Sequence, residues 1–297
     1  MKTKLPLILF MTLGTIVLSA AEFIEYKWVL SGIEGKNQYG PQPITPEKPL
    51  TFSPDQNGRW GSGLAVTFGK VELEALYRVR IDCTAQEQPA GFHYRLKGAG
   101  KWTSYVPVNN GPVTLFVRPL SEKENGIQLS FGKKGKSLEI RSITVEKISP
   151  EEYTSNLLPD DGLEPGFWHR AWGKGDDEFF VELKKDPKSP MGKVLVLPET
   201  QAGEGHKATL PLPFLPKRKY EISFWLRGSE SAAFMCQIVY GGLKPAKLGL
   251  KTEWTEYKFT GETPEEAPEH GMWLMFLRFK AGTPAFEVGG VDFHYLP

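Results

Sequence analysis

The residues Tyr220-Glu-Ile-Ser-Phe-Trp-Leu-Arg227 carry an apolar side chain at every second position, from the tyrosine to the leucine. The positions between them carry Glu, Ser, Trp and Arg. A period of two over eight residues is typical of a β-strand with one buried face, because successive side chains of a strand point to opposite sides. The segment therefore predicts a strand whose outward face carries Trp225 and Arg227.

The same alternation recurs along the chain, for example in Tyr77-Arg-Val-Arg-Ile-Asp-Cys83 and Ile127-Gln-Leu-Ser-Phe131. Glycine and proline account for 31 and 24 of the 297 residues, and they separate these segments with turns. Helical periodicity does not extend beyond about two turns in any window. Many short strands separated by turns predict an all-β fold, either a sandwich or a barrel.

The two halves of the chain resemble each other at four places in the same order. The matched segments are 50–54 with 194–198, 77–81 with 220–224, 101–105 with 253–257, and 138–145 with 286–293. The offsets, 143 to 152 residues, exceed the roughly 20–50 residues of a solenoid repeat, so the repeated element is a whole domain. We expect domains at 22–148 and 156–297, joined by a polar linker at 149–155.

The first 21 residues have the pattern of a signal peptide. Lys2 and Lys4 precede a largely apolar run at 5–18, and Ser19-Ala-Ala21 supplies small residues at the cleavage site. A helix of this run would be about 21 Å long, shorter than the roughly 30 Å core of a bilayer. The sequence predicts a protein without a membrane span that is secreted or periplasmic after cleavage near Ala21.

The composition excludes several classes of function. With 36 basic and 35 acidic residues, the chain lacks the positive excess that nucleic-acid binding requires. Its two cysteines cannot build a disulfide scaffold or a multi-cysteine zinc site. Cys83 and Cys236 lie in register with the apolar faces of strands, so we expect two buried free thiols. H-E-x-x-H and G-x-S-x-G motifs are absent, and the oligomeric state stays open.

Four segments of the second half together resemble a known family. These are Asn156-Leu-Leu-Pro-Asp-Asp-Gly-Leu-Glu164, Lys219-Tyr-Glu-Ile-Ser-Phe-Trp-Leu-Arg227, Glu253-Trp-Thr-Glu-Tyr257 and Phe286-Glu-Val-Gly-Gly-Val-Asp-Phe293. Their order resembles that of carbohydrate-binding modules of families 4, 9 and 22, which are jelly-roll sandwiches of the galactose-binding-like type. The resemblance extends to the first half only through the repeat, and it implies two tandem jelly-roll β-sandwich domains.

The resemblance also suggests a structural calcium ion. Such modules often hold it with the Glu of their first conserved segment and an Asp-Asp pair in the last strand. The positions of that pair read Arg141-Ser142 in the first half and Gly289-Gly290 in the second. Asp161 and Glu164 remain as oxygen donors, but Ca²⁺ takes six to eight. We therefore expect no cofactor, with calcium on Asp161 and Glu164 as the open alternative.

Aromatic rings stack on the apolar face of a sugar, and polar side chains beside them bind its hydroxyls. The residues that meet this description are the strand residues Trp225, Arg227, Phe276 and Arg278, and the loop residues Trp168 and Trp60. The strand residues are expected to form one outward patch. The competing interpretation is that a neighbouring element covers this patch, and that the two loop tryptophans are buried beneath their loops.

The leading hypothesis from the sequence is a secreted, non-catalytic protein that binds a poly- or oligosaccharide. A second hypothesis is a structural or protein–protein interaction module at the bacterial surface. A third is a polysaccharide-active enzyme on a jelly-roll scaffold. Fold alone does not choose among them, because sandwiches host all three.

Overall fold

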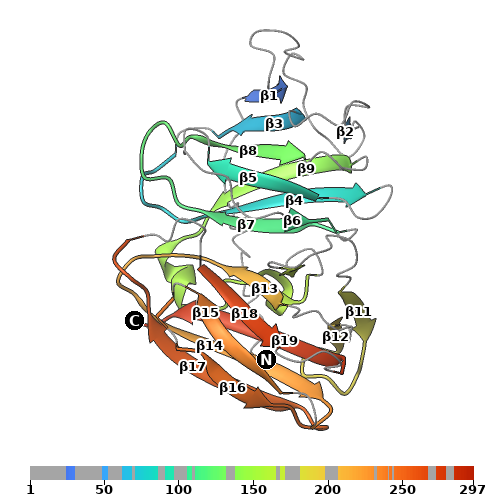
Figure 1. Cartoon of the computed structure of the whole chain (residues 1–297). Coiled ribbons are helices and arrows are strands. Elements are labelled where there is room, and N and C mark those ends of the chain that lie inside the picture. The colour runs from blue at the N-terminus through green and yellow to red at the C-terminus, as the bar shows by residue number, and fades with distance from the viewer. Residues whose placement is uncertain are drawn as a thin grey trace, which may run out of the picture.

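The protein is an all-β chain of two β-sandwich units, as seen in a computed structural model (Figure 1). The structure describes residues 25–30, 49–52, 62–68, 71–85, 91–96, 106–108, 111–131, 138–164, 168–170, 181–197, 207–230, 233–239, 241–242, 244–266, 272–278 and 284–297. The predicted signal peptide, residues 1–21, lies outside these residues, as does Trp60.

Each unit has two antiparallel sheets. The β8 sheet of the first unit has the order β1(Glu25–Leu30), β3(Ser62–Thr67), β8(Gly126–Phe131), β5(Gly91–Leu96), β6(Val106–Pro107). Its β4 sheet has the order β2(Leu50–Phe52), β9(Leu138–Lys147), β4(Tyr77–Ala85), β7(Val113–Val117).

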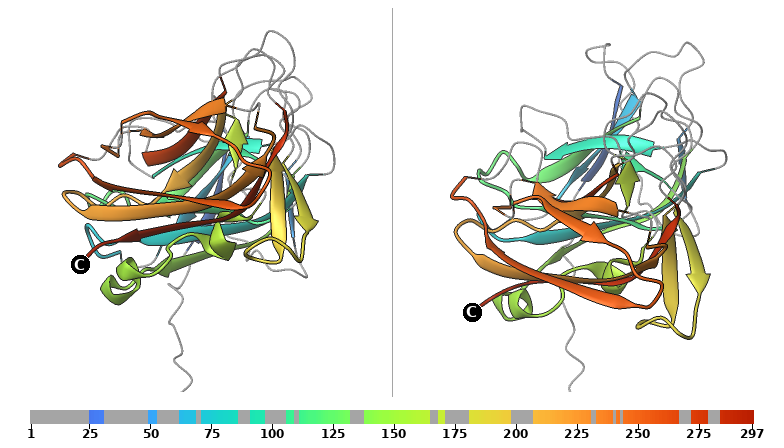
Figure 2. Two further views of the ribbon diagram at one scale, coloured as in Figure 1. Left: turned by 90° about the horizontal axis from the view of Figure 1, so that it is seen from below. Right: turned by 60° about the horizontal axis from the view of Figure 1, so that its bottom comes forward.

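The second unit begins after the 3₁₀ helix η1(Pro150–Thr154) and includes the 3₁₀ helix η2(Pro159–Gly162). Its β18 sheet has the order β10(His169–Arg170), β13(Lys207–Leu212), β18(Met272–Arg278), β15(Ala233–Val239), β16(Ala246–Gly249). Its β14 sheet has the order β11(Glu182–Lys185), β12(Lys193–Leu197), β19(Phe286–Tyr295), β14(Lys219–Gly228), β17(Thr255–Glu262). Figure 2 shows the β11–β12 hairpin, in yellow, at one end of this unit.

The two units share one strand topology. If β2–β9 and β12–β19 are each renumbered 1 to 8, both units have one sheet of order 1-8-3-6 and one of order 2-7-4-5. This is the order of an eight-stranded jelly roll. Strands β1, β10 and β11 extend the sheets at their edges. The predicted all-β, jelly-roll fold class is confirmed.

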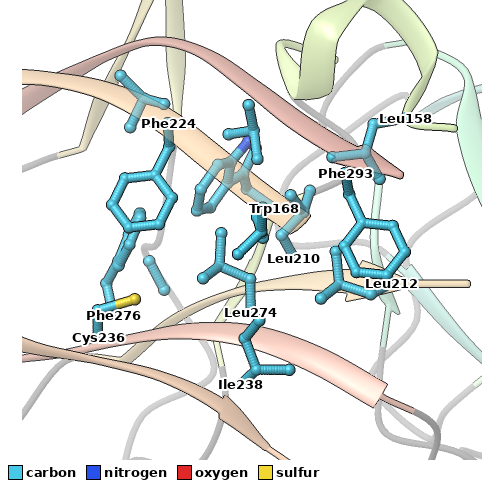
Figure 3. Packing of buried hydrophobic residues seen from close by; sticks show 14 of the residues in the cluster. Leu158, Trp168, Leu210, Leu212, Phe224, Cys236, Ile238, Leu274, Phe276 and Phe293 are labelled. Atoms are coloured by element: carbon cyan, nitrogen blue, oxygen red, sulfur yellow. The ribbon is translucent and has the colours of Figure 1, made fainter. Parts of the chain in front are cut away.

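Residues 220–227 lie in β14, and their alternation sets the core of the second unit. Tyr220, Ile222, Phe224 and Leu226 have no exposed surface. Figure 3 shows Phe224 facing Phe276 across the core, with ring centroids 5.3 Å apart in an edge-to-face arrangement. The two rings come from different sheets, so this contact joins the layers of the sandwich.

The expected outward position of Phe276 is wrong. Phe276 and Leu274 are completely buried in the core, where Figure 3 shows Phe276 beside Cys236 and Leu274 beside Ile238. Trp273 and Met275, on the other face of β18, are also only 9% and 6% exposed. Because both faces of β18 are buried, both carry apolar side chains. The sequence of this strand therefore has no alternation that shows which side chains point into the core.

Both cysteines are buried free thiols, as expected, and they lie in the cores of different units. Burial raises the pKa of Cys83 and of Cys236 to about 12, so neither is a ready nucleophile. Within the part of the chain that the structure describes, no helix has the length and apolar character needed to cross a bilayer.

The two units are joined by packing as well as by the chain. Leu76 and Ile148 of the first unit belong to the hydrophobic core of the second, and Phe116 of β7 packs against it. The predicted linker is ordered as η1, whose start is capped by a hydrogen bond from the Ser149 N–H to the Glu152 carboxylate, 3.0 Å long. Figure 1 shows β7 at the side of the first unit that faces the second.

Candidate functional site

The outer face of the β14 sheet carries a groove of about 310 Å³. Most of its lining comes from β14, β17 and β19, and the rest from the segment around η2 and the β11–β12 turn. The lining residues are Asn156, Asp161, Met191, Glu221, Ser223, Trp225, Glu256, Lys258, Gly290, Val291, Asp292 and His294. One candidate strand residue, Trp225, and one candidate calcium ligand, Asp161, are thus brought together here.

Trp225 is the aromatic residue of the groove, where it is partly exposed. Its neighbours across the ladder are Glu256 on β17 and Gly290 on β19. A β-bulge follows Trp225, and Gly290 has φ +151°. Because Gly290 has no side chain, another side chain can approach the backbone of β19 closely beside the indole.

Met191 forms a second apolar element of the groove. It lies in the β11–β12 turn, next to Gly192 at φ +69°, and its side chain is 44% exposed. A Cβ atom added at Gly290 would lie 3.2 Å from Met191 Cγ and 3.6 Å from its Cε. Met191 therefore lies directly over the glycine, and the indole of Trp225 and this thioether both offer apolar surface.

The next two rungs of the ladder are polar. Ser223 lies between Lys258 on β17 and Asp292 on β19, and Glu221 lies opposite His294. Lys258 Nζ is 3.0 Å from Glu221 Oε1, and this hydrogen bond raises the pKa of the lysine. His294 Nδ1 is 2.5 Å from Asp292 Oδ1, and its Nε2 is 3.9 Å from Glu221 Oε1. The short side chain of Ser223 leaves a polar floor beside the tryptophan.

Asn156 attaches the segment around η2 to the last strand. Its side-chain N–H₂ donates to the Val291 carbonyl and to Asp161 Oδ1, each at 3.2 Å. Its Oδ1 accepts from the N–H groups of Phe293 and Leu158, each at 3.1 Å. Asn156, the first residue of the segment that resembles carbohydrate-binding modules, thus has a structural role. It also positions the Asp161 carboxylate at the groove.

Arg227 does not line the groove, although it lies on the same face of β14 as Trp225. Its Nε donates to Glu287 Oε2 at 2.7 Å, and its Nη2 to Asp186 Oδ2 at 2.8 Å. Its Cζ also lies 4.6 Å from the ring centroid of Trp254, within the range of a cation–π contact. The Arg227 guanidinium is thus bound by the side chains of Glu287, Asp186 and Trp254.

Trp168 is a core residue. It has no exposed surface, its ring stacks on Phe276 at 5.6 Å, and its Nε1–H donates to the Gly162 carbonyl at 2.8 Å. The sugar-binding role expected of Trp168 and Phe276 is therefore wrong, because neither ring reaches the surface. The backbone of Arg278 ends β18, whereas its side chain, like Trp60, lies outside what the structure describes.

The arrangement does not fit calcium at Asp161 and Glu164. Glu164 Oε1 is 2.6 Å from Arg80 Nη1, and Thr114 Oγ1 donates to Oε2 at 3.1 Å. A guanidinium therefore occupies the place of a cation beside this buried carboxylate, while Asp161 accepts from Asn156. The described residues also hold no group of three or more His, Cys, Asp or Glu side chains suited to a metal ion.

The first unit uses the corresponding face in another way. Asp82 precedes the bulge of β4 as Trp225 precedes that of β14, and it pairs with Arg141 at 2.9 Å. Beside it, Arg80 and Thr114 contact Glu164, and Arg78 Nη2 donates to the Leu157 carbonyl at 3.3 Å. In the first unit, part of the face that is equivalent to the groove face of the second unit is thus used for contact with the second unit.

Most of the polar groove residues were missed by sequence reasoning. Glu256 and Lys258 alternate with Tyr257 and Phe259 in β17, so their outward direction was readable. Their proximity to Trp225 was not, because it depends on which strands pair. The β14 strand pairs with β17 and β19, and β18, which carries Phe276 and Arg278 of the expected patch, lies in the opposite sheet.

Comparisons with known proteins give structural neighbours only. No family model matches the chain, and no curated protein sequence matches it. The N-terminal CBM22-1-CBM22-2 tandem domain from Paenibacillus barcinonensis Xyn10C is 13% identical over 84% of this chain and 91% of that chain, with a TM-score of 0.31. The family 11 carbohydrate-binding module from Clostridium thermocellum, in complex with a β-1,3-1,4-mixed-linked tetrasaccharide, is 12% identical over 48% and 96%, with a TM-score of 0.35.

A third neighbour is the enzymatically active domain of bacteriophage CBA120 tailspike protein 4, at 14% identity and a TM-score of 0.38. The alignment covers 50% of this chain but only 22% of the tailspike chain. The structural neighbours thus include carbohydrate-binding modules, one of them a tandem pair, as well as part of a larger protein.

Replacing Gly290 by alanine is expected to destabilise the protein by about 2 kcal/mol, because the new side chain must adopt a positive φ and displace Met191. Chemical denaturation measures the loss. Gly249→Ala is the control, since a Cβ atom there meets nothing within 4 Å. If Gly290→Ala and Gly249→Ala were equally stable, this would contradict the requirement for a glycine at position 290 of the bulge.

Proposed function

We propose that the protein binds a poly- or oligosaccharide in the groove of the β14 sheet. The observation that carries this proposal is a partly exposed tryptophan at a groove with hydrogen-bonding side chains on two adjacent rungs. A pyranose has an apolar face and a rim of hydroxyls, so it needs both kinds of contact at once.

The spacing of the rungs supports this proposal. Side chains two residues apart on a strand are separated by about 6.7 Å, so a sugar stacked on Trp225 has the Ser223 rung within reach. Ser223, Lys258 and Asp292 offer a hydroxyl, an ammonium and a carboxylate there. The sequence resemblance of residues 156–297 to carbohydrate-binding modules points in the same direction.

Binding without hydrolysis is the form of this function that the groove favours. A glycosidase needs a protonated carboxylic acid opposite a second carboxylate. Of the groove carboxylates, Glu221 is paired with Lys258, Asp292 is hydrogen-bonded to His294 and Asp161 accepts from Asn156, so Glu256 has no second uncommitted carboxylate to work with. The signal-peptide pattern supports secretion to a compartment where polysaccharides are met. The common topology of the two units supports their origin as tandem copies, of which the second kept the groove.

Trp225→Ala is expected to weaken glycan binding at least tenfold, because the stacking surface is lost while the polar rungs remain. A glycan array identifies a bound sugar, and calorimetry then measures its affinity. One site per chain is expected, since the corresponding face of the first unit contacts the second. The control is Leu120→Ala, which removes an exposed apolar side chain of the first unit.

Two results would contradict the proposal. Affinity unchanged by Trp225→Ala would place the site elsewhere. No binding to any glycan on the array would favour the alternative of a structural or protein-interaction module.

A further inference from the structure

We propose that the groove selects sugars by charge: it excludes glycans with acidic groups and prefers an amino sugar whose amine is protonated. This inference rests on the proposed carbohydrate binding and names the class of sugar. The site itself is defined by the groove and Trp225, and the charges around them determine which sugar fits.

The groove is strongly negative in a chain that is nearly neutral. Among the described residues, four carboxylates line it, those of Asp161, Glu221, Glu256 and Asp292, against one lysine. The net charge of the lining is therefore −3 with His294 neutral and −2 with His294 protonated. The whole chain carries +1, so the negative potential is local to the groove. A cleft lined by one sign of charge repels ligands of the same sign and concentrates those of the opposite sign.

The positive groups of the groove are already engaged. Lys258 is bound to Glu221 at 3.0 Å, and His294 to Asp292 at 2.5 Å. A uronic acid or a sulfated sugar would have to break one of these pairs to find a cation. It would also leave a carboxylate of the protein without its partner.

Glu256 is the group positioned to bind an amine. It is exposed, and although its charge acts on Lys258, two positions along the strand, that ammonium is hydrogen-bonded to Glu221. It is directly opposite Trp225 in the β14–β17 ladder, where paired Cβ atoms are about 5 Å apart. A sugar stacked on the indole therefore brings its ring substituents within reach of this carboxylate. A protonated amine there gains a charge-assisted hydrogen bond, which is stronger than one between neutral groups.

The test compares three glycans by calorimetry on the full chain. They are a β-1,4-linked glucosamine oligomer with free amines, its fully N-acetylated counterpart of equal length, and a uronic acid oligomer. We expect the free-amine oligomer to bind about tenfold more tightly than the acetylated one, because one hydrogen bond to a charged group is gained. We expect this preference to shrink with added salt and the uronic acid oligomer not to bind.

Glu256→Gln should remove the preference, so that the free-amine and the acetylated oligomers bind with equal affinity. Glu262→Gln is the matched control, since it makes the same charge change on the same strand, in an exposed residue outside the groove. A preference that survives Glu256→Gln, or equal affinities for the three glycans, would overturn the charge selection alone. If none of the three binds and no neutral glycan on the array binds, the proposed function fails, and this inference fails with it.

Discussion

Replacing Trp168 by alanine is expected to lower the free energy of unfolding of the second unit by about 4 kcal/mol. The indole has no exposed surface, it stacks on Phe276, and its N–H is hydrogen-bonded to the Gly162 carbonyl. The substitution therefore creates a large cavity between the two sheets and leaves a buried carbonyl without its donor. Urea denaturation followed by tryptophan fluorescence measures the loss.

Two further variants separate the causes of this effect. Trp168→Phe keeps much of the ring and loses the hydrogen bond, so a smaller cost of about 1–2 kcal/mol is expected. Trp225→Ala removes a partly exposed indole of the groove, and its cost in stability should be below about 1 kcal/mol. If Trp168→Ala weakened glycan binding while the stability of the protein stayed intact, Trp168 would be a binding residue and its assignment to the core would be wrong.

Arg80→Met is expected to destabilise the protein by about 2 kcal/mol at neutral pH. Glu164 is almost completely buried, with 6% of its side chain exposed, and Arg80 is its cationic partner at 2.6 Å. Removal of one partner of a buried pair costs about 3–5 kcal/mol, and the value is reduced here because the Arg80 side chain is 46% exposed. Lys184→Met is the control, because both side chains of the Lys184–Glu182 pair are exposed at the surface.

The loss in Arg80→Met should depend on pH. Burial raises the pKa of Glu164, and Arg80 opposes this rise, so the pKa of the carboxyl is higher still in the variant. A carboxyl whose pKa is raised by folding contributes stability below its unfolded pKa of about 4.3, and this contribution is lost as the pH rises through the folded value. The unsubstituted protein and Arg80→Met should therefore have similar free energies of unfolding near pH 4, and these should diverge toward neutral pH.

Denaturation at a series of pH values measures this divergence. In the double variant Arg80→Met, Glu164→Gln, the buried charge is absent, so its stability should exceed that of Arg80→Met at neutral pH and vary less with pH. A loss for Arg80→Met that is the same at every pH would show that the guanidinium acts through packing and not through the Glu164 charge.

The Arg80–Glu164 pair also explains why the two units differ in function despite their common topology. In the first unit the outer face of the β4 sheet contacts the second unit through Arg80 and Thr114. The equivalent position of Trp225 is Asp82, which is paired with Arg141. A face used for contact between units is not available to a ligand, so the protein is expected to carry its groove on the second unit only.

The features of the structure that depend on residues adjacent in sequence could be predicted from the sequence. The alternation in residues 220–227 correctly predicted the buried face of β14 and the outward direction of Trp225, because side chains of a strand alternate whatever the strand pairs with. The same rule gave the buried thiols Cys83 and Cys236. It failed in β18, where Phe276 points inward, because a strand buried on both faces has no alternation to read.

By itself, the sequence determined the fold class, the buried faces of the amphipathic strands and the outward tryptophan. Only the tertiary structure decided that β17 and β19 flank Trp225, so that Glu256, Lys258 and Asp292 surround it. It also decided that Glu164, an apparent calcium ligand, is paired with Arg80 from 84 positions earlier in the chain. The physical reason is that alternation is local to one strand, whereas strand pairing and the contact between units depend on the packing of residues far apart in sequence.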